Sequence, residues 1–78
     1  MKIEVLGPGC TRCKETFRVV RHVVEQSGLH AEVVKDESIE RMMALGLLAT
    51  PGVAVDGRIV ISGRIPKADE VRHLLGVS

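Results

Sequence analysis

The chain has 78 residues, of which 45% are hydrophobic and 27% charged, and its formal net charge is +1 at pH 7. This is the composition of an ordinary globular protein, and the length allows one modest core, so residues 1–78 are expected to form one domain. With no basic stripe and a single aromatic residue, Phe17, we expect no nucleic-acid partner. No apolar run approaches the roughly 18 residues of a membrane span, and the first residues lack the pattern of a signal peptide. We therefore expect a cytoplasmic protein with no membrane association.

The first segments of the chain predict a strand followed by a helix. Residues 2–6 form an apolar run that Gly7-Pro8-Gly9 interrupts, as expected for a short buried strand and its turn. From Thr11 the pattern becomes helical, because apolar residues then recur at spacings of four, three and four. Gly28 suits the left-handed residue that ends such a helix.

A second strand and a second helix are expected next. Residues 31–35 are centred on two valines and predict the strand. Asp36, Glu37 and Ser38 then offer the side chains that favour a helix start, and Gly46 is the expected end of the short helix.

The last third of the chain predicts a hairpin and a final helix. Asp56-Gly57 lies between the β-branched runs 53–55 and 59–61, which favours a two-residue type I′ turn. Pro66 is expected in the first turn of the last helix, which Gly76 ends.

The predicted order is therefore βαβαββα. Two strands joined by a helix should be parallel with a right-handed crossover, whereas the hairpin is antiparallel. We expect an α/β fold in which a single four-stranded mixed sheet carries helices on both faces.

The two cysteines, Cys10 and Cys13, lie where the first strand gives way to the first helix. Residues three apart on a helix have Cβ atoms about 5–6 Å apart, close to disulfide geometry. The first N–H groups of a helix have no internal partner and favour a thiolate at Cys10, and Arg12 and Lys14 add positive charge. Cys10 is therefore the candidate nucleophile, and Cys13 is the candidate resolving thiol.

Two other interpretations of the cysteine pair remain open at this point. The pair could be two inert buried residues, or it could bind a soft metal such as Cu(I), since small metal carriers also place Cys-x-x-Cys after their first strand. Metal carriers of that kind run βαββαβ and end in a strand, whereas this chain is expected to end in a helix. Nothing in metal transfer requires the proline of Thr50-Pro51-Gly52 before the hairpin. We therefore favour redox chemistry without a metal or other cofactor.

Three motifs make the chain resemble the thioredoxin superfamily, and most closely its small redox-active disulfide proteins. They are Gly-Pro-Gly-Cys-x-x-Cys after the first strand, Thr-Pro-Gly before the hairpin and Val-Asp-Gly within it. The resemblance implies a thioredoxin-like fold and a thiol–disulfide oxidoreductase that acts on protein disulfides, with roles in electron transfer and redox homeostasis. It also implies that Pro51 is cis beside the cysteines and that the Thr50 backbone pairs with the substrate peptide.

Some positions depart from the usual pattern of that superfamily. Gly9 stands where typical thioredoxins have tryptophan, and Thr11-Arg12 replaces their Gly-Pro, so Thr11 and Arg12 are candidate modulators of the redox centre. Glu4 lies six residues before Cys10, the spacing of the buried acid that assists proton transfer to the resolving cysteine in thioredoxins; the alternative is a solvent-facing carboxylate.

The resemblance also suggests partners. A disulfide reductase, such as a flavoprotein like thioredoxin reductase, would return electrons to the cysteine pair, and protein disulfides would receive them. We expect the protein to be a monomer. The other interpretations to be tested are a small Cu(I) or Zn²⁺ carrier that uses the same cysteines and a redox sensor without catalysis.

Overall fold

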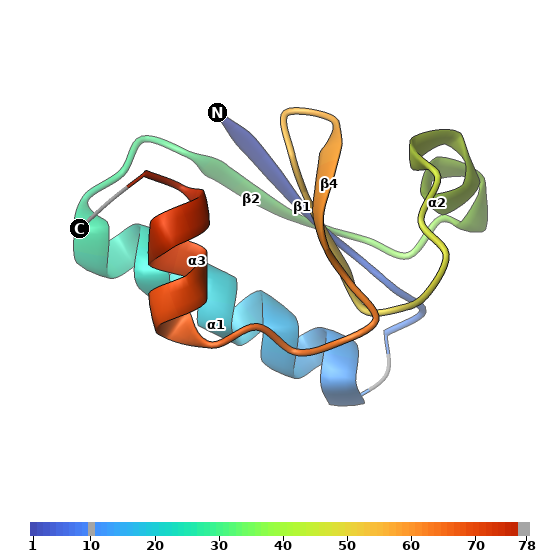
Figure 1. Cartoon of the computed structure of the whole chain (residues 1–78), viewed down its shortest axis with the longest axis horizontal. Coiled ribbons are helices and arrows are strands. Elements are labelled where there is room, and N and C mark those ends of the chain that lie inside the picture. Colours follow the sequence, from blue (N-terminus) through green and yellow to red (C-terminus); the bar gives the residue numbers. More distant parts are fainter. Residues whose placement is uncertain (10, 77–78) are drawn as a thin grey trace.

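The structure is a computed structural model that describes residues 1–9 and 11–76. Its elements occur in the predicted βαβαββα order (Figure 1). In chain order they are β1 (Lys2–Leu6), α1 (Thr11–Ser27), β2 (Glu32–Asp36), α2 (Ile39–Leu45), β3 (Gly52–Val55), β4 (Arg58–Ser62) and α3 (Ala68–Leu74).

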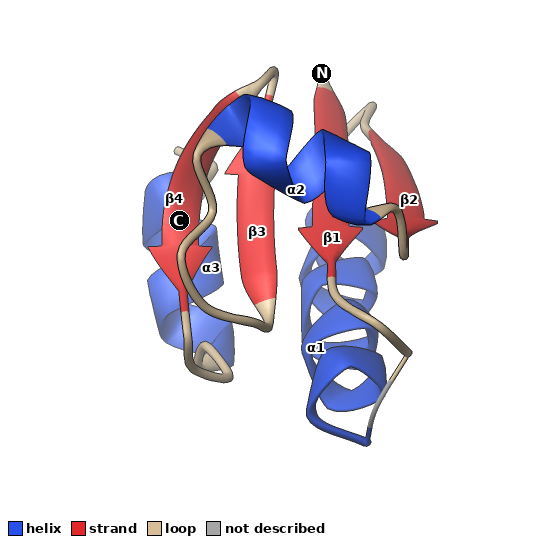
Figure 2. Ribbon diagram, turned by 90° about the vertical axis from the view of Figure 1, so that its right-hand side faces the viewer, coloured by secondary structure: helices blue, strands red, loops and turns tan. Residues whose placement is uncertain are grey.

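The four strands form one mixed sheet in the order β2-β1-β3-β4. The pairing of β1 with β2 is parallel, whereas β3 is antiparallel to both β1 and β4. Helices cover both faces: α2 lies on one face, and α1 and α3 lie on the other (Figure 2). The predicted fold class is therefore confirmed.

Each face of the sheet has its own hydrophobic cluster. The larger cluster joins the sheet to α1 and α3 and consists of Ile3, Val5, Val20, Val23, Val24, Val53, Ile61, Val71 and Leu75. The smaller cluster lies under α2 and consists of Leu6, Met42 and Ala54. Because side chains alternate along a strand, β1 supplies residues to both clusters and forms the centre of the molecule.

Local sequence signals fix both ends of α2 and the turn between β3 and β4. Ser38 is the N-cap of α2, where its Oγ accepts the N–H of Arg41 at 3.2 Å, and Gly46 ends the helix with φ = 78°. Asp56 and Gly57 have φ values of 49° and 84°, which match the type I′ turn expected between β3 and β4.

Three predicted boundaries were wrong, one of them the end of the second strand, which extends to Asp36 and not only to Lys35. The last helix begins at Ala68 with Lys67 as its N-cap, so Pro66 precedes the helix instead of lying in its first turn. The second strand begins at Glu32 and not at Ala31, because the Ala31 N–H bonds the Leu29 carbonyl in the preceding turn. Within residues 1–9 and 11–76, no helix is long and apolar enough to cross a membrane.

Candidate active site

One edge of the sheet gathers the segments that carry the predicted site. Strands β1, β2 and β4 end at this edge and β3 begins there, because β3 alone runs in the opposite direction. The Gly7 N–H bonds the Asp36 carbonyl at 3.1 Å, and the Gly63 N–H bonds the Pro51 carbonyl at 2.9 Å. These bonds tie together loops that are far apart in the sequence.

Cys13 lies in the first turn of α1 and is 1% exposed. A Cβ atom added at Gly7 would overlap the Cys13 sulfur and would lie 3.8 Å from the Thr50 Cβ. The chain after β1 therefore lies directly beside Cys13 and close to the segment before β3. Cys10, the predicted nucleophile, lies outside the described residues, and Thr11 is exposed as the first residue of α1.

The peptide bond between Thr50 and Pro51 is cis, the geometry that the resemblance implies. Pro51 is fully buried, and its carbonyl accepts the Gly63 N–H. Thr50 is partly exposed beside it. The loop before β3 thus lies beside the first turn of α1, on the same side as Cys13.

The guanidinium group of Arg12 extends toward the loop that follows β4. Its Nη2–H donates to the Gly63 carbonyl at 3.2 Å, and the side chain is exposed. Since Gly63 also bonds Pro51, this contact links the first turn of α1 to the segment before β3. The positive charge of Arg12 therefore lies near the end of β4, at the edge of the sheet that carries the predicted site.

Glu4 is buried, with 3% exposure, and forms an ion pair with Arg41 of α2. The Nε–H of Arg41 donates to Oε2 at 2.9 Å, and its Nη2–H donates to Oε1 at 2.8 Å. These hydrogen bonds, opposed by burial, lower the pKa of Glu4. The carboxylate is therefore ionised at neutral pH and is a weak proton acceptor. Strand alternation directs it to the α2 face, together with Leu6.

Sequence reasoning missed two charged residues near the site. Arg41 belongs to no recognisable sequence motif. A buried carboxylate at Glu4 nevertheless requires a charged partner, and α2 is the helix that packs on the face of the sheet where Glu4 lies. For Glu37 the sequence indicates only a role at a helix start. Its Oε1 atom lies 2.9 Å from the position that a Cβ would take on Gly9, beside the start of the cysteine motif.

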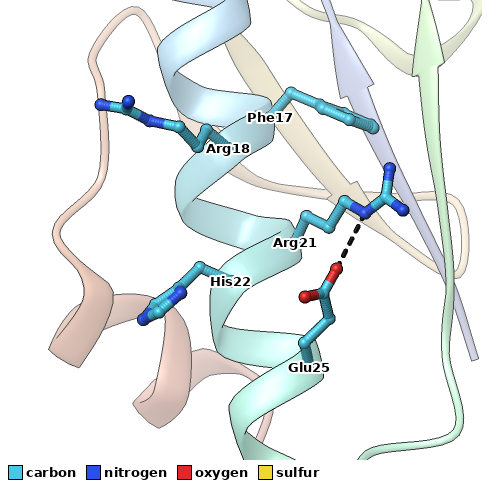
Figure 3. Close-up of a pocket in the computed structure, with 5 residues that line it drawn as sticks. All are labelled: Phe17, Arg18, Arg21, His22 and Glu25. Carbon is cyan, nitrogen blue, oxygen red and sulfur yellow. Dashed lines mark hydrogen bonds and ion pairs between the residues drawn. The ribbon is translucent and has the colours of Figure 1, made fainter.

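A surface hollow of about 290 Å³ lies elsewhere on α1 (Figure 3). Figure 3 shows the Arg21 side chain directed at Glu25, whose carboxylate accepts the Nε–H at 2.9 Å. None of the predicted site residues is among its lining residues, which are Phe17, Arg18, Arg21, His22 and Glu25. The hollow is therefore separate from the candidate site. In the part of the chain that the structure describes, no group of three or more histidine, cysteine or acidic residues could hold a metal ion.

A mixed sheet with a cysteine in the first turn of α1 and a cis-proline before β3 defines a thioredoxin-like protein. Comparison with known proteins agrees: residues 1–76 match the family model described as "Thioredoxin domain". A protein named thioredoxin from Methanothermobacter thermautotrophicus is 36% identical over 75 residues, which cover 96% of this chain and 97% of the relative. Another thioredoxin, from Methanocaldococcus jannaschii, is 38% identical over 73 residues, which cover 94% of this chain and 84% of that protein. The chain therefore belongs to the thioredoxin family.

Proposed function

We propose that this protein exchanges a Cys10–Cys13 dithiol with the disulfides of protein substrates. The observation that carries the proposal is Cys13 in the first turn of α1, packed against Gly7 and next to Thr50, in a chain of the thioredoxin family. A buried thiol at this position is poorly accessible to a protein substrate. The attacking thiol is then Cys10, which precedes α1 directly in the chain.

The start of α1 favours a thiolate. Its first N–H groups have no partner within the helix and carry partial positive charge. A free cysteine has a pKa of about 8.5, and a position of this kind lowers it to about 3.5–7.5. A thiol in such a position forms the reactive thiolate more readily than a free cysteine does.

The exchange proceeds in two steps. The Cys10 thiolate attacks one sulfur of the substrate disulfide, whose S–S bond breaks, and the other substrate sulfur leaves as a thiolate that takes a proton from water. Cys13 then gives its proton to water, and its thiolate attacks the Cys10 sulfur. This closes the Cys10–Cys13 disulfide and releases the second substrate sulfur as a thiolate, which takes a proton from water. Two electrons pass from the protein to the substrate.

The neighbouring residues have roles in binding the substrate. We propose that the backbone of Thr50, held by the buried cis-Pro51, pairs with the substrate chain. A disulfide reductase, such as a flavoprotein, would restore the dithiol. A reducing compartment such as the cytoplasm suits a protein that works as a dithiol.

Single cysteine variants test this proposal. The Cys10→Ser variant is expected to lose reduction of a model protein disulfide, because no exposed thiolate remains to attack. The Cys13→Ser variant is expected to accumulate a mixed disulfide with the substrate, seen as a mass increase that dithiothreitol reverses. Turnover by Cys10→Ser at the normal rate would refute the proposed roles.

Membership in the thioredoxin family does not favour the alternative that the protein is a metal carrier. Titration of the reduced protein with Cu(I) separates the two functions. A carrier would bind the ion tightly and stoichiometrically without reductase activity. A redox sensor would form a reversible disulfide without multiple turnover.

A further inference from the structure

Two opposite charges flank the candidate active site. Glu37 follows β2, and Gly63, which accepts a hydrogen bond from Arg12, follows β4. Since β2 and β4 are the outer strands of the sheet and both end at the edge that carries the site, these charges lie on opposite sides of it. A negative charge thus marks the β2 side, and a positive charge marks the β4 side.

The negative charge is close to the start of the cysteine motif. The carboxylate of Glu37 lies against Gly9, with Oε1 2.9 Å and Oε2 3.5 Å from the position that a Cβ would occupy there. Gly9 has φ = 80°, a conformation that side chains rarely adopt, and it precedes Cys10 directly. The Glu37 side chain is exposed, so its charge is available to a docked substrate.

The positive charge is held in place on the opposite side. A hydrogen bond to the Gly63 carbonyl positions the Arg12 guanidinium, which carries further N–H donors. Within the described residues neither Arg12 nor Glu37 forms an ion pair, whereas Glu4 pairs with Arg41 and Arg64 pairs with Glu70. No ion pair among the described residues therefore competes with a partner for Arg12 or Glu37.

We propose that Arg12 and Glu37 are specificity-determining residues that select disulfide substrates by charge order. The preferred substrate carries a basic side chain on one side of its reacting cysteine, over Glu37, and an acidic side chain on the other side, over Arg12. The chain direction that backbone pairing at Thr50 imposes makes the order matter. This inference rests on the proposed thiol–disulfide exchange.

Two isomeric peptides test the charge order. Each has one cysteine, with lysine and aspartate on opposite sides in the two possible orders, and each is linked by a disulfide to a coloured aromatic thiol. Reduced protein, freed of other reductants, attacks the peptide sulfur and releases the coloured thiolate. The second-order rate constant with each isomer is measured in a single turnover, and the ratio of the two constants cancels any change in the intrinsic reactivity of the cysteines.

The unchanged protein is expected to react about fivefold faster with one isomer than with the other at low salt. This is the size of effect expected from the electrostatic interaction of exposed charges several ångströms apart. At about 1 M salt the ratio should approach one, because the Debye length shrinks to about 3 Å. The double variant Arg12→Glu with Glu37→Arg keeps the net charge and is expected to prefer the other isomer.

A matched control exchanges charges at the other end of the same outer strands. The double variant Glu32→Arg with Arg58→Glu alters exposed residues at the starts of β2 and β4 and should keep the original preference. Equal rates for the two isomers, or a preference that the Arg12 and Glu37 exchange leaves unchanged, would overturn the inference while the proposed function stands. Failure to release the thiolate from either isomer would overturn both.

Discussion

At the residue scale, the position of Cys13, the proposed resolving cysteine, depends on a glycine. Gly7 is buried at the end of β1, and the space that a side chain would fill there is taken by the Cys13 sulfur. Its φ lies outside the left-handed region, so the backbone conformation itself would accept an alanine. Steric room for the Cys13 sulfur, and not backbone freedom, therefore requires glycine at this position.

The Gly7→Ala variant is expected to displace the Cys13 sulfur. Overpacking of this kind costs about 1–3 kcal/mol of stability, and the resolving step should slow because the thiol is misplaced. The mixed disulfide with a substrate should then persist longer than in the unchanged protein, which quenched-flow mass spectrometry measures.

Gly52→Ala provides the matched control for Gly7→Ala. A Cβ at Gly52 would collide with the Leu47 side chain instead of a sulfur atom. This variant also overpacks a buried site but should not prolong the mixed disulfide, because no sulfur atom is displaced. If both variants prolong it equally, general destabilisation and not displacement of the sulfur is the cause.

At the scale of elements, the Glu4–Arg41 ion pair joins β1 to α2. The smaller cluster under α2 has few buried side chains, and this ion pair adds two charge-assisted hydrogen bonds to it. The Glu4 carboxylate is buried. If it loses its charge, the hydrogen bonds from Arg41 are weakened, and water cannot fully replace them because the site is shielded from solvent.

The contribution of Glu4 to stability should depend on pH. Its pKa is lowered in the folded protein, chiefly by the hydrogen bonds from Arg41, so the ionised form stabilises the fold above the ordinary value of 4.5. That stability is lost as the pH falls through the lowered pKa. The Glu4→Gln variant should therefore be less stable by about 1–2 kcal/mol at pH 7, and the difference should vanish in acid.

Urea unfolding of the unchanged protein and of the Glu4→Gln variant, from pH 7 down to acid pH, measures this difference in stability. Glu70→Gln is a suitable control, because Glu70 pairs with Arg64 on the surface, where ion pairs contribute little. A Glu4→Gln difference that is constant down to low pH would show that side-chain shape and not charge is responsible.

At the scale of the whole molecule, the two faces of the sheet are unequally packed. The cluster under α1 and α3 is the larger, whereas α2 has seven residues and leaves Ile39 68% and Met43 74% exposed. Regions with few buried apolar contacts open at the lowest free energy. The α2 face is thus the less stable side of the molecule.

Hydrogen exchange should reveal this asymmetry. Amides of α2 are expected to exchange faster than those of β1 and α1, and Glu4→Gln should accelerate α2 selectively because it releases the helix from the sheet. Exchange by mass spectrometry with proteolysis resolves these segments. Protection of α2 equal to that of β1 would contradict the expected asymmetry.

The element order, the type I′ turn at Asp56-Gly57 and a helix start at Asp36-Glu37-Ser38 were predicted from the sequence, because each depends on residues within a few positions of one another. The start of α3 was placed too early, since Pro66 is equally compatible with the extended segment before a helix. Local sequence signals thus predict the presence and type of an element more accurately than the residues at which it begins and ends.

The sequence by itself determined the thioredoxin-like fold and the location of the cysteine motif where the first strand gives way to the first helix. Only the tertiary structure decided that Glu4 is paired with Arg41, that Arg12 bonds Gly63, and that Glu37 lies against Gly9. The reason is physical. Hydrophobic periodicity and turn chemistry act between near neighbours in the chain, whereas these charged contacts join segments between 28 and 51 positions apart that meet only when the sheet has formed.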